Sequence, residues 1–306
     1  MTVTATALSS PAGVARAIFR IPTLSRRDLA GWLLLMPAAI FFLAFFVVPA
    51  LTLFSYSLLT QRADGIAALP LTVSHYTHFF GTAVYSHVLF ATLRMAFVTA
   101  ALAVLLGYPV ALVMLRSSPM GMRLMTIMLI APLIVSVVVR TYGWQLILAN
   151  SRSGVLNYVL MSLGLTDQPL RVLYTETAVV IASLHVFFPM MVLPLVSALA
   201  KINPEVEDAA RTLGAGSWRT FRRVSLPLSL PGLAVGFTLV FSLTASSFVT
   251  PAILGGTGAQ MLGNLIEQQV TAVYDWPFGA TVAVVLVVTV LALNFLSTWF
   301  FERRAA

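Results

Sequence analysis

Charged side chains are scarce in this sequence. They make up 9% of its 306 residues, whereas an ordinary soluble domain has about 25%. Hydrophobic residues make up 59%. So few charged groups cannot cover the surface of a water-soluble protein of this length, and the surplus apolar surface needs lipid to face. The composition therefore excludes a soluble globular domain, a disordered chain and a fibrous protein.

Cysteine is absent, and Lys201 is the only lysine. Without cysteine the chain has no disulfide, no thiolate metal site and no cysteine nucleophile. The sequence also lacks the phosphate-binding motif G-x-x-x-x-G-K-[ST], the zinc motif H-E-x-x-H and the nucleophile motif G-x-S-x-G. We therefore expect no enzymatic centre and no cofactor bound by this chain itself.

Acidic residues are missing from the centres of the apolar stretches. All ten Asp and Glu residues lie in loops or at the ends of such stretches. Pumps and carriers that couple to protons or sodium usually need ionisable groups at mid-membrane depth. If this chain moves a solute uphill, we expect a partner to supply the energy. A standalone secondary carrier or channel is the alternative function.

Six apolar stretches dominate what the sequence does contain. Each is close to the roughly 20 residues that a helix needs to cross a bilayer. Their apolar residues are continuous rather than alternating, which favours helices over a β-barrel. The sequence predicts an all-α membrane protein with a flexible tail over residues 1–30 and a six-helix transmembrane domain over 31–306. The stretches are Trp32–Tyr56, Val88–Leu115, Leu124–Leu148, Glu176–Ala200, Leu233–Leu254 and Phe278–Phe301.

The basic residues predict the orientation of these helices. Thirteen Lys and Arg residues lie in the termini and in the second and fourth connections, and three lie in the odd-numbered connections. Because cytoplasmic loops are enriched in basic residues, both termini are expected in the cytoplasm. The net charge of +8 therefore does not indicate a nucleic-acid partner. Inside the stretches, Arg94 and Arg140 are expected to snorkel to the interface, and His185 is expected to be a packing residue.

The fourth connection, residues 201–232, predicts a short helix that ends in a bend. Asn203 followed by Pro204 is typical of a helix start. Gly214 can adopt the left-handed backbone conformation that ends such a helix. An amphipathic element of this kind can lie on lipid, or it can transmit force to the spans when a partner grips it.

A second short helix is expected after the bend. Ser217 is predicted to cap it, and Trp218 and Phe221 give it an aromatic face. Pro227 and Pro231 are predicted to end it before the fifth stretch. The connection therefore predicts a helix, a glycine bend, a second helix and a proline stop.

The spacing within this connection is specific. Asp208-Ala209-Ala210 is followed after three residues by Gly214, and Val224-Ser225-Leu226-Pro227 comes after a further nine. This pattern resembles the EAA loop of binding-protein-dependent ABC importer permeases, which is E-A-A, three residues, Gly, nine residues and I-x-L-P. Asp208 and Val224 replace the usual Glu and Ile.

Three further segments resemble the spermidine/putrescine branch of that family: Arg140–Asn157, Ser246–Gly256 and Asp275–Ala280. The resemblance implies a multi-pass permease of the bacterial inner membrane with the fold of a type I ABC importer. It also implies that residues 201–232 form coupling helices. The positions expected to contact the ATPase or to act as hinges are Glu207, Asp208, Ala209, Ala210, Gly214, Trp218, Leu226 and Pro227.

The same resemblance implies the partners. In this family a cytoplasmic ABC ATPase dimer binds ATP and Mg²⁺, two permease subunits pair, and an extracytoplasmic substrate-binding protein docks on the outer face. We expect the second permease to be a distinct chain, and membrane lipid to surround both.

The fifth stretch contains several hydroxyl residues and Pro251, and polar, broken helices tend to line cavities. Alternatively, the hydroxyls bond to their own backbone or to a neighbouring helix. A polyamine would favour carboxylates in its path, but Ser246–Ala252 has none, and only Glu176 and Glu267 are candidate outer acids. Polyamines, opines and amino-acid derivatives therefore stay open as solutes. The predicted path residues are Ser242, Ser246, Ser247, Phe248 and Thr250.

Two local features precede the sixth stretch. Residues Met261–Val273 predict a short helix on the outer face. Asp275, Trp276 and Pro277 are typical of a helix start, with Asp275 as the cap.

Overall fold

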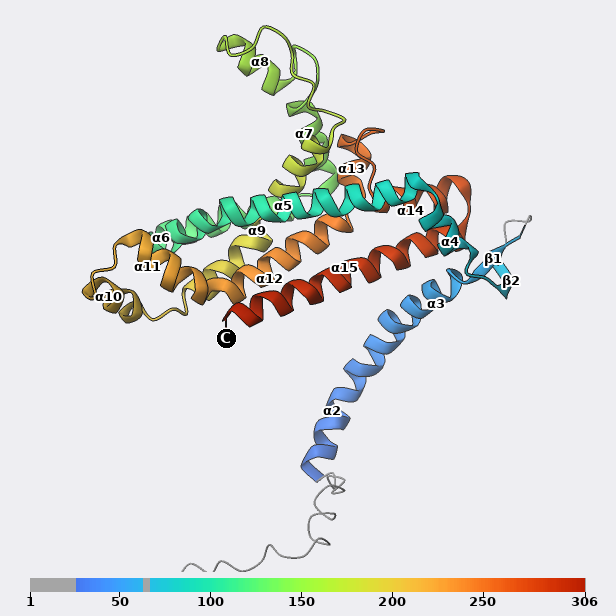
Figure 1. The fold of residues 1–306 in the computed structure, drawn as a ribbon, viewed down its shortest axis with the longest axis horizontal. Helices are drawn as coiled ribbons and strands as arrows, with labels where there is room; N and C mark the ends of the chain where they lie inside the picture. Colours follow the sequence, from blue (N-terminus) through green and yellow to red (C-terminus); the bar gives the residue numbers. More distant parts are fainter. Residues whose placement is uncertain (1–25, 63–66, 306) are drawn as a thin grey trace, which may run out of the picture. The chain divides into compact units, whose positions relative to one another are not determined.

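The computed structural model describes residues 26–62 and 67–305, which are mostly helical (Figure 1). Residues 1–25, most of the predicted tail, lie outside the described part. The chain divides into two compact units, Met1–Thr52 and Leu53–Ala306. A continuous apolar helix over Leu33–Tyr56 confirms the first predicted stretch. It consists of α2 (Arg26–Phe42), the π-helix η1 (Leu43–Val47) and α3 (Val48–Tyr56).

Four long helices form the body of the second unit. Three of them confirm the second, fourth and sixth predicted stretches. Their buried side chains form a common core, and α5, α9, α12 and α15 lie side by side in Figure 1. The helices are α5 (Ala83–Arg116), α9 (Glu176–Leu199), α12 (Leu226–Ala245) and α15 (Trp276–Ala305).

Two glycines allow α9 and α12 to cross in close contact. A Cβ atom on Gly232 would lie 2.4 Å from the Cβ atom of Ala198. A Cβ atom on Gly236 would lie 2.6 Å from the sulfur of Met191. Small residues at membrane helix crossings permit this close packing, which here holds α12 against α9.

The third predicted span, Leu124–Leu148, is wrong as a single helix. α6 (Pro119–Ile134) and α7 (Val137–Ile147) meet at an angle of 99°. Pro132 cannot donate a helical hydrogen bond, and Val135 is already extended with a ψ of 138°. Hydropathy detected the apolar length but not the bend. The described residues therefore contain five continuous candidate spans and one broken pair.

The limits of the fifth predicted span, Leu233–Leu254, are also wrong. α12 (Leu226–Ala245) is part of a continuous helix over Ser217–Ala245, so Pro227 lies inside a helix and does not end one. Pro231 lies inside the same helix, so the predicted proline stop is wrong as well. The helix ends at Ala245, and residues 246–248 form a break before α13 (Val249–Leu254).

Short elements cluster at the end of the bundle that carries α4. The helix predicted over Met261–Val273 is confirmed, and its last turn is a π-helix. Asp275 is confirmed as a cap, because its Oδ1 accepts a hydrogen bond of 3.0 Å from the N–H of Phe278. A two-stranded antiparallel sheet, β1 with β2, was not predicted. The elements are β1 (Leu59–Gln61), β2 (Ala67–Leu71), α4 (Ser74–Gly81), α14 (Leu262–Gln268) and η3 (Gln269–Val273).

The long connection from α7 to α9 contains α8 (Val155–Ser162) and is organised by Asn157. This side chain is 1% exposed. Its amide donates to the carbonyls of Ala149, Ser151 and Leu170, and its Oδ1 accepts from the N–H of Leu170 at 2.8 Å. One side chain therefore replaces the backbone pairing that this loop lacks.

We expect Asn157→Leu to loosen this loop, because it leaves four backbone groups without their partner. Each unsatisfied buried group costs about 1–3 kcal/mol. Trypsin should cut faster at the exposed residues Arg152 and Arg171 in the purified variant. Ser153→Ala, which removes only a surface hydroxyl contact with Ser151, is the control. Equal cleavage rates for both variants would contradict the prediction.

Candidate functional site

The connection between α9 and α12 begins with α10 (Pro204–Thr212), as predicted. Asn203 caps it: its Oδ1 accepts a hydrogen bond of 3.1 Å from the N–H of Glu205. Pro204 occupies the first turn, where no helical N–H is needed. Arg211 lies 3.9 Å from Glu207 and 3.5 Å from Asp208. These ion pairs join residues one turn apart on α10 and stabilise the helix.

Gly214 forms the bend after α10, as predicted. Its φ is +82°, and its N–H donates to the carbonyl of Arg211 at 2.9 Å. The next N–H, of Ala215, reaches back to the carbonyl of Ala210 at 3.0 Å. This pair of hydrogen bonds is the Schellman motif, which requires a left-handed residue at this point. The bend therefore depends on the glycine backbone.

The second helix is present, but the predicted cap at its start and the predicted stop at its end are both wrong. α11 (Ser217–Thr220) runs through the π-helix η2 (Phe221–Ser225) directly into α12. Gly216, and not Ser217, is the residue at its N-cap, and no side chain caps it. The rings of Trp218 and Phe221 stack with centroids 5.3 Å apart.

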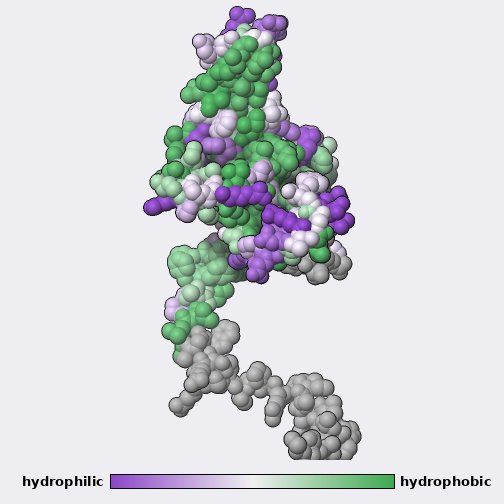
Figure 2. Space-filling view, turned by 90° about the vertical axis from the view of Figure 1, so that its left-hand side faces the viewer, coloured by the Kyte–Doolittle hydropathy of each residue, from purple (hydrophilic) through white to green (hydrophobic). Residues whose placement is uncertain are grey.

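The exposed surface of this connection combines charge and large apolar groups. The side chain of Asp208 is 70% exposed, and Trp218 and Leu213 are 72% and 89% exposed. Ala209 and Gly214 are exposed as well, whereas Ala210, Leu226 and Pro227 are half-buried. Figure 2 shows hydrophilic residues gathered on this end of the bundle.

Two features of this surface were not predicted. Leu213 is not among the predicted contact residues, although a large apolar residue at the end of a polar helix is a signal in the sequence. Glu207 is half-buried, and its Oε1 accepts a hydrogen bond of 2.6 Å from the hydroxyl of Ser225. A contact across 18 residues leaves no local sequence signal.

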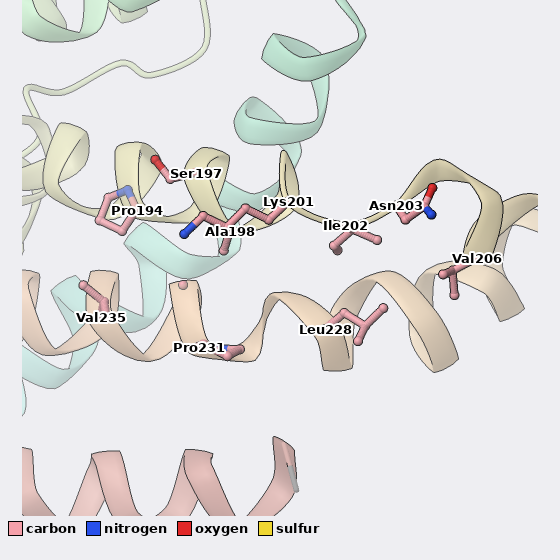
Figure 3. A pocket seen from close by; sticks show the side chains of 11 residues that line it. Pro194, Ser197, Ala198, Lys201, Ile202, Asn203, Val206, Leu228, Pro231 and Val235 are labelled. Atoms are coloured by element: carbon pink, nitrogen blue, oxygen red, sulfur yellow. The ribbon is translucent and has the colours of Figure 1, made fainter.

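A cavity of about 600 Å³ lies between the end of α9 and the start of α12 (Figure 3). In the close-up, Pro194 and Ala198 come from α9, and Leu228, Pro231 and Val235 from α12. Lys201 and Asn203, in the connection to α10, add polar groups to this mostly apolar lining. The cavity therefore borders the close contact of the two helices at Gly232, which is one of its lining residues.

The predicted path residues lie around the break after α12. The hydroxyl of Ser242 donates to the carbonyl of Thr238 and accepts from the amide of Asn294, both at 2.7 Å. That of Ser246 donates to the carbonyl of Ser242 at 2.9 Å. These two hydroxyls therefore bond to their own helix backbone or to a neighbouring helix, which is the alternative to lining a path.

The rest of the break is held by Asn264. Its amide donates to the carbonyl of Phe248 at 2.9 Å, and the Phe248 ring is half exposed. Ser247 is half-buried, and the Oγ1 of Thr250 is buried without a hydrogen-bond partner among the described residues. A role for these residues in a path stays a prediction.

The ionisable residues inside the spans have different environments. Arg94 forms an ion pair with Glu176, which neutralises one of the two candidate outer acids. Arg140 is half-buried, and its Nε and Nη1 have no hydrogen-bond partner within the described residues; the expected snorkelling stays a prediction. The indole of Trp144 donates to Nδ1 of His185 at 3.3 Å, but the His185 side chain is exposed, so its packing role stays a prediction.

Comparisons with known proteins agree on one family. The family model described as "Binding-protein-dependent transport system inner membrane component" matches residues 103–304. The chain is 34% identical to the spermidine/putrescine transport system permease protein PotB of Haemophilus influenzae, with 83% of this chain and 88% of that protein covered. It is 32% identical to PotB of Escherichia coli, with 89% and 94% covered.

A solved structure has the same fold. It is the bacterial alginate ABC transporter in complex with alginate pentasaccharide-bound periplasmic protein, and the match has a TM-score of 0.71. The sequences are 17% identical, and the match covers 92% of this chain and 96% of the other.

Proposed function

Because the chain belongs to the family of binding-protein-dependent transport system inner membrane components, we propose that residues 203–226 couple it to a cytoplasmic ABC ATPase. The chain is a permease subunit of an ABC importer and a multi-pass protein of the bacterial inner membrane. The proposal assigns the coupling to α10, the bend at Gly214 and α11.

The observation that carries this proposal is the rigid, exposed bend at one end of the bundle. Coupling needs a contact whose energy differs between two conformational states. A helix fixed by a cap at one end and by a Schellman motif at the other is preorganised for such a contact. Its exposed groups, Asp208, Leu213 and Trp218, suit a cleft that offers a cationic group and an apolar surface.

The partners complete the proposal. The ATPase dimer binds ATP and Mg²⁺, a distinct second permease pairs with this chain, and a substrate-binding protein delivers the solute from outside. Arg219, Arg222 and Arg223, which are exposed beside the bend, favour a cytoplasmic location for this end. Both termini are cytoplasmic in this arrangement.

The proposed solute is a small organic cation of the polyamine class. Support comes from the names of the relatives and from α12, whose C-terminal end points at the break in residues 246–248. The negative end of a helix dipole favours cations even where no carboxylate is present. Glu267 is exposed and can add attraction at the surface, whereas Glu176 is occupied by Arg94.

A tagged chain, expressed with its neighbouring transport components, tests both parts. We expect an ABC ATPase to copurify, and uptake of radiolabelled putrescine to stop when that ATPase is deleted. Uptake that survives the deletion would refute coupling and favour a standalone carrier. Competition separates the solutes: spermidine should block putrescine uptake, and an opine or an amino acid should not. The reverse ranking would overturn the polyamine assignment alone.

A further inference from the structure

We infer that the hydrogen bond between Ser225 and Glu207 is the joint through which movement of α10 reaches α12. This inference rests on the proposed coupling function. Ser225 and Glu207 are positioning residues in this scheme, because they act through the helices that they join and not by contact with the ATPase or the solute.

The joint is the direct polar link between α10 and the start of α12. The hydroxyl of Ser225 is buried and donates to the Glu207 carboxylate at 2.6 Å. A hydrogen bond to an ionised acceptor is about twice as strong as one between neutral groups. Arg211 lies 3.9 Å from the other carboxylate oxygen, so the Glu207 carboxylate has a polar partner on each oxygen. The link therefore transmits a pull on α10 better than packing alone.

The hydrogen bond also connects α10 directly to the start of α12, across the least regular part of the connection. Between α10 and α12 lie the bend at Gly214, the one-turn helix α11 and the π-helix η2. π-Helical turns are rare and interrupt the regular hydrogen-bond pattern of an α-helix. Ser225 is the last residue of η2, so the force from Glu207 enters where the regular helix α12 begins.

α12 is placed to act as a lever. Its close contact with α9 at Gly232 and Gly236 provides a pivot. The cavity of about 600 Å³ borders this pivot, because Ala198 and Gly232 line it together with Leu228 at the α10 end of α12. The long arm ends at the break beside Phe248. Movement at Ser225 is thereby converted into movement at the predicted path.

A second serine, on the same face of the helix as Ser225, connects α12 to α5. Ser229, one turn after Ser225, hydrogen-bonds through its Oγ to the hydroxyl of Tyr108 on α5 at 2.9 Å. The Tyr108 ring also meets Phe221 edge-on, with centroids 5.1 Å apart. Because Ser229 is less than one turn from Gly232, this contact lies near the pivot and moves least.

The test uses the whole transporter in vesicles, with solute uptake per ATP hydrolysed as the measurement. Ser225→Ala should copurify with the ATPase and still hydrolyse ATP, but transport about tenfold fewer molecules per ATP, which corresponds to about 1.4 kcal/mol of lost coupling. Ser225→Thr, which keeps the hydroxyl, should restore the ratio. The control is Ser162→Ala in α8, whose hydroxyl bonds to the carbonyl of Val159 in the same helix, and it should leave the ratio unchanged.

A double-mutant cycle separates the joint from a structural role. If Ser225 and Glu207 act through one contact, Ser225→Ala combined with Glu207→Ala should lower the ratio no further than Glu207→Ala alone. An unchanged ratio in Ser225→Ala, or fully additive losses, would overturn the joint. A wild-type chain that does not copurify with any ATPase would instead refute the coupling function on which the joint rests.

Discussion

Replacing Gly214 with proline should abolish the stimulation of ATP hydrolysis by solute in the assembled transporter. The glycine has a φ of +82°, whereas a proline ring holds φ near −65°. Proline also lacks the N–H that bonds the carbonyl of Arg211. The backbone conflict alone costs about 3 kcal/mol, more than an exposed bend of this size can absorb. The angle between α10 and α11 would then change, and the ATPase could no longer contact both helices at once.

The neighbouring glycine provides the control for this substitution. Gly216 has an ordinary φ of −67°, and a Cβ atom added to it would meet no heavy atom within 4 Å. Gly216→Ala should therefore keep the stimulation close to the wild-type value, measured as ATP hydrolysis with and without solute and binding protein. Normal stimulation in Gly214→Pro would contradict the role given to the bend.

Features that depend on neighbouring residues were predictable from the sequence. Asn203 and Pro204 start α10, and Gly214 ends it, because caps and left-handed turns act over three or four residues. The same holds for Asp275 at the start of α15. The lengths of most spans followed from hydropathy, since every membrane helix needs a similar apolar length.

Features set by distant contacts were not predictable in this way. Pro227 and Pro231 carry the same local signal as a helix stop, yet the packing of α12 against α9 keeps both prolines within one helix. The bend between α6 and α7 leaves the hydropathy of the third stretch unchanged.

The same limit applies to the candidate site. From the sequence, Glu207 is expected to be an exposed contact residue, and only the folded structure shows its hydrogen bond with Ser225. Side-chain partners that lie 18 residues or more apart need the folded arrangement of helices before they can be recognised.

The second large effect is expected at the pivot, where Gly232→Ala should destabilise the folded permease by about 3 kcal/mol. The new Cβ atom would lie 2.4 Å from the Ala198 Cβ and 2.9 Å from the carbonyl oxygen of Pro194, and backbone atoms cannot yield as a flexible side chain would. α9 and α12 would have to separate, and the contacts around the crossing would loosen together. Thermal unfolding of the detergent-purified transporter measures the loss.

Two further variants isolate the cause of that loss. Gly143→Ala in α7 introduces a Cβ atom with no heavy atom within 4 Å, so it should unfold at the wild-type temperature or slightly above. Ala198→Gly removes the nearest clashing atom, so combining it with Gly232→Ala should recover part of the stability, while the contact with the Pro194 carbonyl remains. If the double variant unfolds no later than Gly232→Ala alone, the crossing is not what limits stability. α12 would then have no fixed pivot on α9.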